Sequence, residues 1–226
     1  MTLAAAIPDV ETFADFLQRA AARLSPDPPG PGAPLSNPGG DHDLDPRGLA
    51  AAPGRPHREA AVLVPVVASG SDVHVVLTIR ASHLRDHSGQ VAFPGGKIDP
   101  ADASPAGAAL REAHEEIGLD PGRVSVLGYL DPYLSATGFL VTPVVGAIRG
   151  PTRLRLNASE VAEAFEVPLP FLMDRARHEV RSGMHRGLMR YYYAIPFGER
   201  LIWGLTAGIV HNLARRLYGE ERIAVE

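Results

Sequence analysis

Apolar runs of strand length recur along the chain from about residue 60. Five of them are rich in Val, Ile and Tyr, residues that favour a pleated, half-buried surface. They cover residues 61–67, 73–79, 124–129, 139–148 and 191–196. We expect each run to form a β-strand.

Three other segments place apolar residues at helical spacing. Residues 10–24 form the first and residues 201–217 the last. Between the second and third strand runs, a helix is indicated by Ser104 as N-cap, Pro105 at the first helical position and Gly118 as the left-handed residue that ends it. Strands mixed with helices for two faces predict an α+β fold, an α/β/α sandwich around a mixed β-sheet.

A stretch rich in Pro and Gly separates the first helix from the rest of the chain. Residues 26–56 contain nine Pro and six Gly, with few large apolar residues to bury. The sequence therefore predicts an N-terminal helix within residues 1–25, an irregular linker over residues 26–57 and one folded domain over residues 58–226.

Charge and composition narrow the class of protein. The net charge of the 226-residue chain is −4, and no run of Lys or Arg suggests a nucleic-acid partner. The apolar runs are too short to span a bilayer and the N-terminus lacks the pattern of a signal peptide, so we expect a cytoplasmic protein without a membrane partner. The absence of Cys excludes disulfides and thiolate chemistry. The oligomeric state stays open, with a homodimer among the alternatives.

The helix after Ser104 carries the strongest chemical signal. Glu112, Glu115 and Glu116 fall within an arc of roughly 100° on it, beside an apolar arc that would face the core. Like charges this close repel one another, and a divalent cation would neutralise them. Oxygen ligands in a chain without Cys indicate a hard cation, Mg²⁺ or Mn²⁺ rather than zinc. A solvated acidic helix face is the alternative.

The residues around these glutamates resemble a Nudix box, the signature of hydrolases that cleave nucleoside diphosphates linked to another group. The matching positions are Gly96, Asp102, Arg111, Glu112, Glu115, Glu116, Gly118 and Leu119. Asp102 stands where the family usually has Glu, and eight residues rather than seven separate it from Arg111. The resemblance implies a Nudix-type sandwich and a metal-dependent pyrophosphohydrolase.

A second motif lies directly upstream of the box. It consists of residues 77–81, Arg85, Gly89 and residues 93–96, and its spacing is similar to the signature of coenzyme A pyrophosphatases within the Nudix superfamily. This resemblance implies cleavage of coenzyme A or a derivative into adenosine 3′,5′-bisphosphate and 4′-phosphopantetheine or its acyl form. A Nudix hydrolase of ADP-ribose or NADH is one alternative, and a Nudix-fold binding domain without turnover is another.

The resemblance also assigns roles to individual residues. The expected metal ligands are the box carboxylates and a backbone carbonyl of the glycine loop: Glu112, Glu115, Glu116 and Gly96, or Gly95 in its place. Having no side chains, Gly95 and Gly96 let the backbone approach the metal or the phosphates closely. Arg111 would brace the carboxylates. The general base would be Glu115 or, as second choice, Glu160, for which an acid at a helix start is the alternative.

Cationic residues near the upstream motif are candidates for binding substrate phosphates. Arg80 and Arg85 flank the motif, and Lys97 follows the glycine loop. A ligand with a pyrophosphate and a 3′-phosphate needs several cations, whereas ordinary surface arginines are the alternative. His83 and His87 have the spacing of a helical metal pair, but no third soft ligand accompanies them, which favours polar surface or phosphate neighbours.

Overall fold

The computed structural model describes residues 12–30, 44, 57–83, 89–135, 137–185 and 187–219. The helices of this part of the chain are α1 (Phe13–Arg23), α2 (Pro105–Ile117), α3 (Leu169–Met173) and α4 (Leu205–Tyr218), with short 3₁₀ turns at Pro121–Arg123 and Arg175–Arg177. Its strands are β1 (Arg58–Ser69), β2 (Asp72–Arg80), β3 (Val91–Ala92), β4 (Gly95–Lys97), β5 (Val124–Tyr129), β6 (Tyr133–Leu134), β7 (Phe139–Arg149), β8 (Val161–Pro168), β9 (Glu179–His185), β10 (Leu188–Phe197) and β11 (Arg200–Trp203). All five predicted strand runs lie within observed strands.

The main sheet combines parallel and antiparallel pairing. Its central order is β3-β2-β1-β7-β5, and β4 also pairs with β1, β6 with β7 and β8 with β2. β1 and β7 run parallel, whereas the other pairs of this sheet are antiparallel. The predicted mixed sheet is confirmed.

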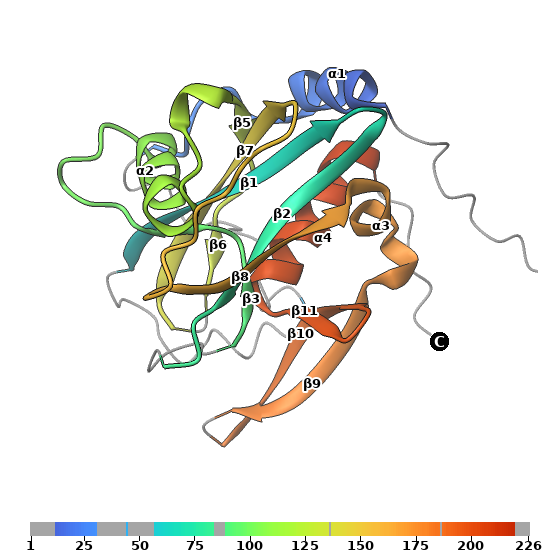
Figure 1. The fold of residues 1–226 in the computed structure, drawn as a ribbon. Coiled ribbons are helices and arrows are strands. Elements are labelled where there is room, and N and C mark those ends of the chain that lie inside the picture. Colours follow the sequence, from blue (N-terminus) through green and yellow to red (C-terminus); the bar gives the residue numbers. More distant parts are fainter. Residues whose placement is uncertain are drawn as a thin grey trace, which may run out of the picture.

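Alternate side chains of β1 contribute to two separate cores. Val62, Val64 and Val66 belong to the cluster that includes buried residues of α1, α3 and α4. Ala61 and Leu63 belong to the cluster that includes the apolar face of α2. Because successive side chains of a strand point to opposite faces, α2 covers one face of the sheet and the other helices cover the opposite one (Figure 1). The predicted α/β/α sandwich is confirmed.

The N-terminal helix is attached to this sandwich by packing and by hydrogen bonds. Phe16 of α1 is fully buried in the core shared with α4. Ser25 forms an isolated β-bridge with Tyr129, and Arg216 Nε donates to the Arg23 carbonyl oxygen at 2.8 Å. Most of the linker predicted over residues 26–57 lies outside the described residues, so the proposed domain organisation stays a prediction.

The apolar stripe at 201–217 predicted one helix, and this was wrong for its first four residues. Leu201 and Ile202 pair with Pro196 and Ile195 in the β10–β11 ladder, and Gly204, at φ +59°, separates this strand from α4. A cross-strand ladder is a tertiary contact that helical spacing in the sequence does not reveal. The resulting three-stranded sheet, β11-β10-β9, projects from the body of the sandwich (Figure 1).

The predicted limits of α2 are confirmed. Ser104 is the N-cap and its hydroxyl accepts from the Gly107 N–H at 3.1 Å, while Pro105 opens the helix. Gly118 ends it in the left-handed conformation at φ +65°. None of the helices in the described part of the chain has the length and hydrophobicity that a bilayer crossing demands.

Candidate active site

The three glutamates of α2 differ strongly in their surroundings. The Glu116 side chain is 5% exposed, that of Glu112 is 16% exposed and that of Glu115 is 52% exposed. The burial of Ala113 and Ile117 against the sheet sets this rotation of the helix. Two of the predicted carboxylates therefore lie inside the protein, and the third lies at its surface.

The glycine loop lies between α2 and β1 so closely that side chains would not fit. Gly95 and Gly96 pair with Val62 and Ala61 across β4 and β1, and the Gly95 N–H donates to Glu116 Oε2 at 3.2 Å. A Cβ atom on Gly96 would lie 2.5 Å from the carboxylate carbon of Glu112, and one on Gly95 would lie 2.4 Å from the Ala61 carbonyl oxygen. Glycine at position 96 lets the backbone approach the Glu112 carboxylate, and glycine at position 95 lets the loop pair closely with β1.

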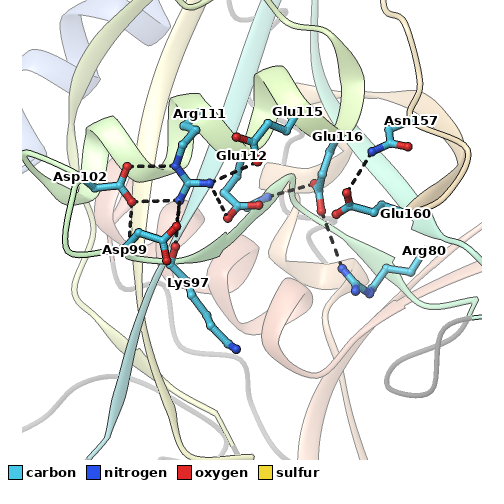
Figure 2. Close-up of polar contacts among 11 residues, drawn as sticks. Arg80, Lys97, Asp99, Asp102, Arg111, Glu112, Glu115, Glu116, Asn157 and Glu160 are labelled. Carbon is cyan, nitrogen blue, oxygen red and sulfur yellow. Dashed lines mark hydrogen bonds and ion pairs between the residues drawn. The ribbon is translucent and has the colours of Figure 1, made fainter.

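Arg111 connects the acidic residues on the outer side of α2. Its Nε and Nη2 donate to the two oxygens of Asp102 at 3.0 and 2.9 Å, as Figure 2 shows. Nη1 donates to Glu112 Oε1 at 3.0 Å and to Glu115 Oε2 at 3.3 Å, and Nη2 also donates to the Lys97 carbonyl oxygen at 3.2 Å. One planar guanidinium thus fixes three carboxylates and a loop carbonyl.

Asp102, the position that departs from the usual box, anchors Arg111. Its side chain is 8% exposed, and the hydrogen bonds from Arg111 hold the pKa of its carboxyl below the usual value. A third hydrogen bond to its carboxylate comes from the Asp99 N–H at 2.8 Å. Asp102 is therefore engaged on both oxygens and does not join the inner carboxylates.

Glu160 comes to the inner carboxylates from a distant part of the sequence. It ends a turn directly before β8, and in the β2–β8 ladder Arg80 lies opposite Val161. The Ala81 N–H donates to the Glu160 carbonyl oxygen at 2.8 Å. Glu160 therefore lies in a turn, and the alternative of an acid at a helix start is wrong because a strand follows.

Burial and mutual repulsion disfavour the ionised forms of Glu112 and Glu116. Burial raises the pKa of Glu116 to about 7, and Glu112 and Glu160 raise it further, although the Gly95 N–H and Arg80 counteract the rise. Burial also raises the pKa of Glu112, which Glu115 and Glu160 reinforce and Arg111 opposes. A bound cation would neutralise the negative charges of Glu112 and Glu116, which burial and repulsion make unfavourable.

The donor set fits a hard divalent cation. Within the ranges given above, no three Asp, Glu or His side chains are already arranged to coordinate one ion, since Glu112 and Glu115 turn toward Arg111. The available donors are nevertheless all oxygens, from Glu112, Glu116 and the carbonyls of the glycine loop. Mg²⁺ and similar ions prefer such ligands.

Arg80 lies on the opposite side of Glu116 from Arg111. Its Nη1 is 3.8 Å from Glu116 Oε1, and its buried Nε has no hydrogen-bond partner among the described residues. Lys97 is exposed and contributes its carbonyl oxygen to Arg111, and Figure 2 shows its side chain directed away from the carboxylates. Arg85 and His87 lie outside the described residues.

Two residues near Glu160 have contacts that the sequence did not reveal. Asn157 donates from its backbone N–H to the Glu116 carbonyl oxygen at 2.9 Å and from Nδ2 to Glu160 Oε1 at 3.0 Å. His83 Nε2 donates to the Ser159 carbonyl oxygen at 3.0 Å. Asn-x-Ser before an acid is a turn signal in the sequence, but the partners of such a turn depend on the tertiary fold.

The sequence of the chain matches a known protein family. The profile described as NUDIX domain matches residues 56–181, which is more than half of the chain. The chain belongs to the Nudix family. Relatives from Escherichia coli (strain K12) and Shigella boydii serotype 18, each named "Uncharacterized Nudix hydrolase NudL", are 43% identical over 161 residues, covering 71% of this chain and 83% of each relative. The predicted superfamily is confirmed.

Solved structures include similar chains. A crystal structure of a Nudix hydrolase from M. smegmatis, RenU, has 27% identity and a TM-score of 0.44, covering 52% of this chain and 74% of that one. A crystal structure from Deinococcus radiodurans has 15% identity and a TM-score of 0.46, covering 75% and 90%. Nudix hydrolases generally use divalent metals. Membership gives the class of reaction, hydrolysis, whereas the substrate depends on residues outside the box.

Proposed function

We propose that this Nudix hydrolase cleaves the pyrophosphate bond of coenzyme A or a derivative with Mg²⁺ or Mn²⁺, releasing adenosine 3′,5′-bisphosphate and 4′-phosphopantetheine or its acyl form. The observation that carries the proposal is the position of Arg80. This residue belongs to the upstream motif that resembles coenzyme A pyrophosphatases, and its guanidinium lies beside Glu116. Its buried Nε has no hydrogen-bond partner among the described residues. A phosphate oxygen is a fitting acceptor for such a donor.

The residues divide the chemistry between them. A bound divalent cation would neutralise the charge of the pyrophosphate and lower the pKa of a coordinated water. Glu112, Glu116 and the Gly96 carbonyl would hold it, and Arg111 would keep Glu112 and Glu115 in place. Glu160 is the preferred general base, because its charge acts on both inner carboxylates whereas Glu115 is half exposed and bonded to Arg111.

Arg80, Arg85 and Lys97 would bind the substrate phosphates. Coenzyme A carries a 3′-phosphate in addition to its pyrophosphate, so the loss of a cation weakens its binding more than that of ADP-ribose. We expect Arg80→Ala to raise KM for coenzyme A several-fold more than KM for ADP-ribose. Arg181→Ala is the matched control, since Arg181 pairs with Glu179 on the projecting sheet. Equal losses on both substrates would remove Arg80 from substrate selection.

The deciding experiment measures hydrolysis of coenzyme A, ADP-ribose and NADH in parallel, each with Mg²⁺, Mn²⁺ or EDTA, with products identified by mass. The expected result is release of the two coenzyme A products, abolished by EDTA and by Glu116→Gln. Preference for ADP-ribose or NADH would keep the carboxylate site and refute the coenzyme A assignment. No turnover would favour a binding domain. The cytoplasmic location and a homodimer stay predictions, which cell fractionation and light scattering can check.

A further inference from the structure

The turn at residues 157–160, called here the Glu160 turn, is fastened to both neighbours of the active site. Toward α2, the Asn157 N–H donates to the Glu116 carbonyl oxygen at 2.9 Å. Toward the end of β2, the Ala81 N–H donates to the Glu160 carbonyl oxygen at 2.8 Å, one residue after Arg80. The backbone that carries Glu160 is therefore tied to the residues that carry Glu116 and Arg80.

A side chain from the segment after β2 adds a third attachment. His83 Nε2 donates to the Ser159 carbonyl oxygen at 3.0 Å, which requires the proton to be on Nε2. This carbonyl lies in the middle of the Glu160 turn. The turn is thus held from two directions before any side chain within it is considered.

Asn157 uses both ends of its side-chain amide inside the turn. Oδ1 accepts from the Ser159 N–H at 3.2 Å and from the Ser159 hydroxyl at 2.6 Å, an Asx turn. Nδ2 donates to Glu160 Oε1 at 3.0 Å, as the close-up in Figure 2 shows. Because the turn fixes the acceptor end of the amide, the donor end is directed at the Glu160 carboxylate.

We infer that Asn157 is a positioning residue, which holds the Glu160 carboxylate beside Glu112 and Glu116 for the reaction. This inference rests on the proposed function, since it requires that Glu160 act in hydrolysis. Glu160 raises the pKa of both inner carboxylates, and the same repulsion drives its own side chain away from them. A half-buried glutamate without a fixed donor would turn toward solvent, where it regains rotamer freedom.

The chemical type of the donor suits a base. A neutral amide orients the carboxylate and leaves its charge and its second oxygen free. An Arg or Lys in the same place would form an ion pair, which stabilises the ionised form and weakens the carboxylate as a proton acceptor. Asn is also short enough to act from within the turn, so its reach is set by the backbone and not by a flexible stem.

The test removes the donor and retains the turn. In Asn157→Asp both side-chain oxygens can accept from Ser159, but nothing donates to Glu160. Asn157→Ser, which adds no charge, keeps a hydroxyl acceptor and also lacks the donor. We expect kcat to fall about tenfold to a hundredfold in both variants, with KM changed less than about threefold, the range usual for groups that orient a reacting side chain. Asp174→Asn is the control, because Asp174 forms a similar cap at the Arg175–Arg177 turn near α3.

The decisive step is a double-mutant cycle with Glu160→Gln, measured on whichever nucleoside diphosphate the wild type hydrolyses. If Asn157 acts through Glu160, its variants change kcat less than about twofold in the Glu160→Gln background. A residue that merely supports the fold would give multiplied losses and a lower melting temperature in every background. Melting temperatures of all variants identify those that are unfolded.

Each outcome has a distinct meaning. Independent, multiplied losses, or a Glu160→Gln enzyme with wild-type kcat, would overturn the positioning role while leaving the proposed hydrolysis intact. A wild type that hydrolyses ADP-ribose but not coenzyme A would overturn the substrate assignment alone, since the cycle runs on either substrate. A protein that turns over none of them would overturn both.

Discussion

Two clusters of titratable groups are largely removed from water: the carboxylates Glu112 and Glu116 of α2, and His178 with His211 of α4. The histidines bond to each other and to the backbone, whereas the carboxylates gather like charges. His178 Nε2 donates to the Leu172 carbonyl oxygen at 2.8 Å, and its Nδ1 lies 3.1 Å from His211 Nδ1. His211 stacks on Tyr193 with ring centroids 4.0 Å apart. Burial lowers the pKa of His178 and lowers that of His211 to about 3, with His178 adding to the second shift, so both rings stay neutral.

The carboxylates of α2 accept hydrogen bonds from Gly95 and Arg111, but they also repel one another. Burial and neighbouring charges raise the pKa of Glu112 and Glu116, and the buried Nε of Arg80 has no partner in the described ranges. The difference teaches how to separate two kinds of buried polar cluster. A cluster that serves the fold can keep its groups neutral, whereas one that serves a cation retains like charges that the cation neutralises.

Removing one inner carboxylate should have the largest effect. Glu116→Gln takes away a metal ligand, so we expect kcat to fall about 10³-fold or more, whereas the metal-free protein should melt at the same temperature or higher because a buried charge is gone. Steady-state kinetics and melting curves in EDTA measure the two effects. A variant that keeps its activity, or that melts far below the wild type, would contradict the assignment of Glu116 to function.

Replacing Arg111, whose guanidinium bonds Asp102, Glu112 and Glu115, should have the second-largest effect on activity. Lys in place of Arg111 cannot bond Asp102, Glu112 and Glu115 together, so we expect Arg111→Lys to lose about 10²-fold in kcat with little change in melting temperature. Arg123→Lys is the matched control, because Arg123 donates to the carbonyls of Pro151 and Arg149 outside the site. Full activity of Arg111→Lys would refute the bracing role.

Adding a cation should stabilise only a protein with an intact cluster. At a Mn²⁺ concentration about 100 times Kd, binding to the native state adds about 2.7 kcal/mol to the free energy of unfolding. We expect this gain for the wild type and for a variant of His211, but a much smaller one for Glu116→Gln. Thermal unfolding with and without Mn²⁺ provides the measurement, and equal gains in all three proteins would place the ion elsewhere.

The histidine pair should show the smallest effect, in the dependence of stability on pH. Because the pKa of His211 is lowered on folding, the unfolded state binds more protons below about pH 6.5, and stability falls as pH decreases. Between pH 7 and pH 5 this group should remove about 2 kcal/mol. His211→Gln should flatten that slope without changing kcat at neutral pH, as urea unfolding at each pH would show.

Glu116 also contributes to the dependence of stability on pH, and its contribution has to be separated from that of His211. Glu116, with its pKa raised to about 7, has the opposite sign, since the native state binds the extra proton and its contribution falls as pH rises through this range. The His211 comparison is therefore best made in the Glu116→Gln background. Parallel slopes with and without His211 would show that the pair has no effect on acid stability.

Structural features that depend on neighbouring residues in the sequence could be predicted. The limits of α2 follow from Ser104, Pro105 and Gly118, and the long strands follow from runs of apolar residues. The box glutamates were placed on one helix, but their unequal burial depends on how α2 rests on the sheet. The short strand β4 was not predicted, since three residues that include two glycines carry no strand signal.

Features that depend on strand register could not be predicted. Glu160 reaches Glu116 because β8 pairs with β2 and leaves the Glu160 turn beside Ala81. The partners of Asn157 and His83 arise from the same register. The spacing at 201–217 fits a helix from its first residue, but Leu201 and Ile202 pair with β10 in a hairpin. The contacts around Glu160 join residues far apart in the chain, whereas the β10–β11 hairpin is local and competes with a helical spacing.

The parallel pairing of β1 with β7 has a consequence for the order of folding. Partners such as Val62 and Pro143 are about 80 residues apart, and the whole of α2 lies in the segment between them. Contacts of this separation form late, because loop closure must precede any gain from them. The helix carries both caps in its own sequence and can form earlier. We therefore expect Glu116 to stay hydrated and ordinarily acidic for most of the folding reaction, and to become buried beside its neighbours only when the sheet closes.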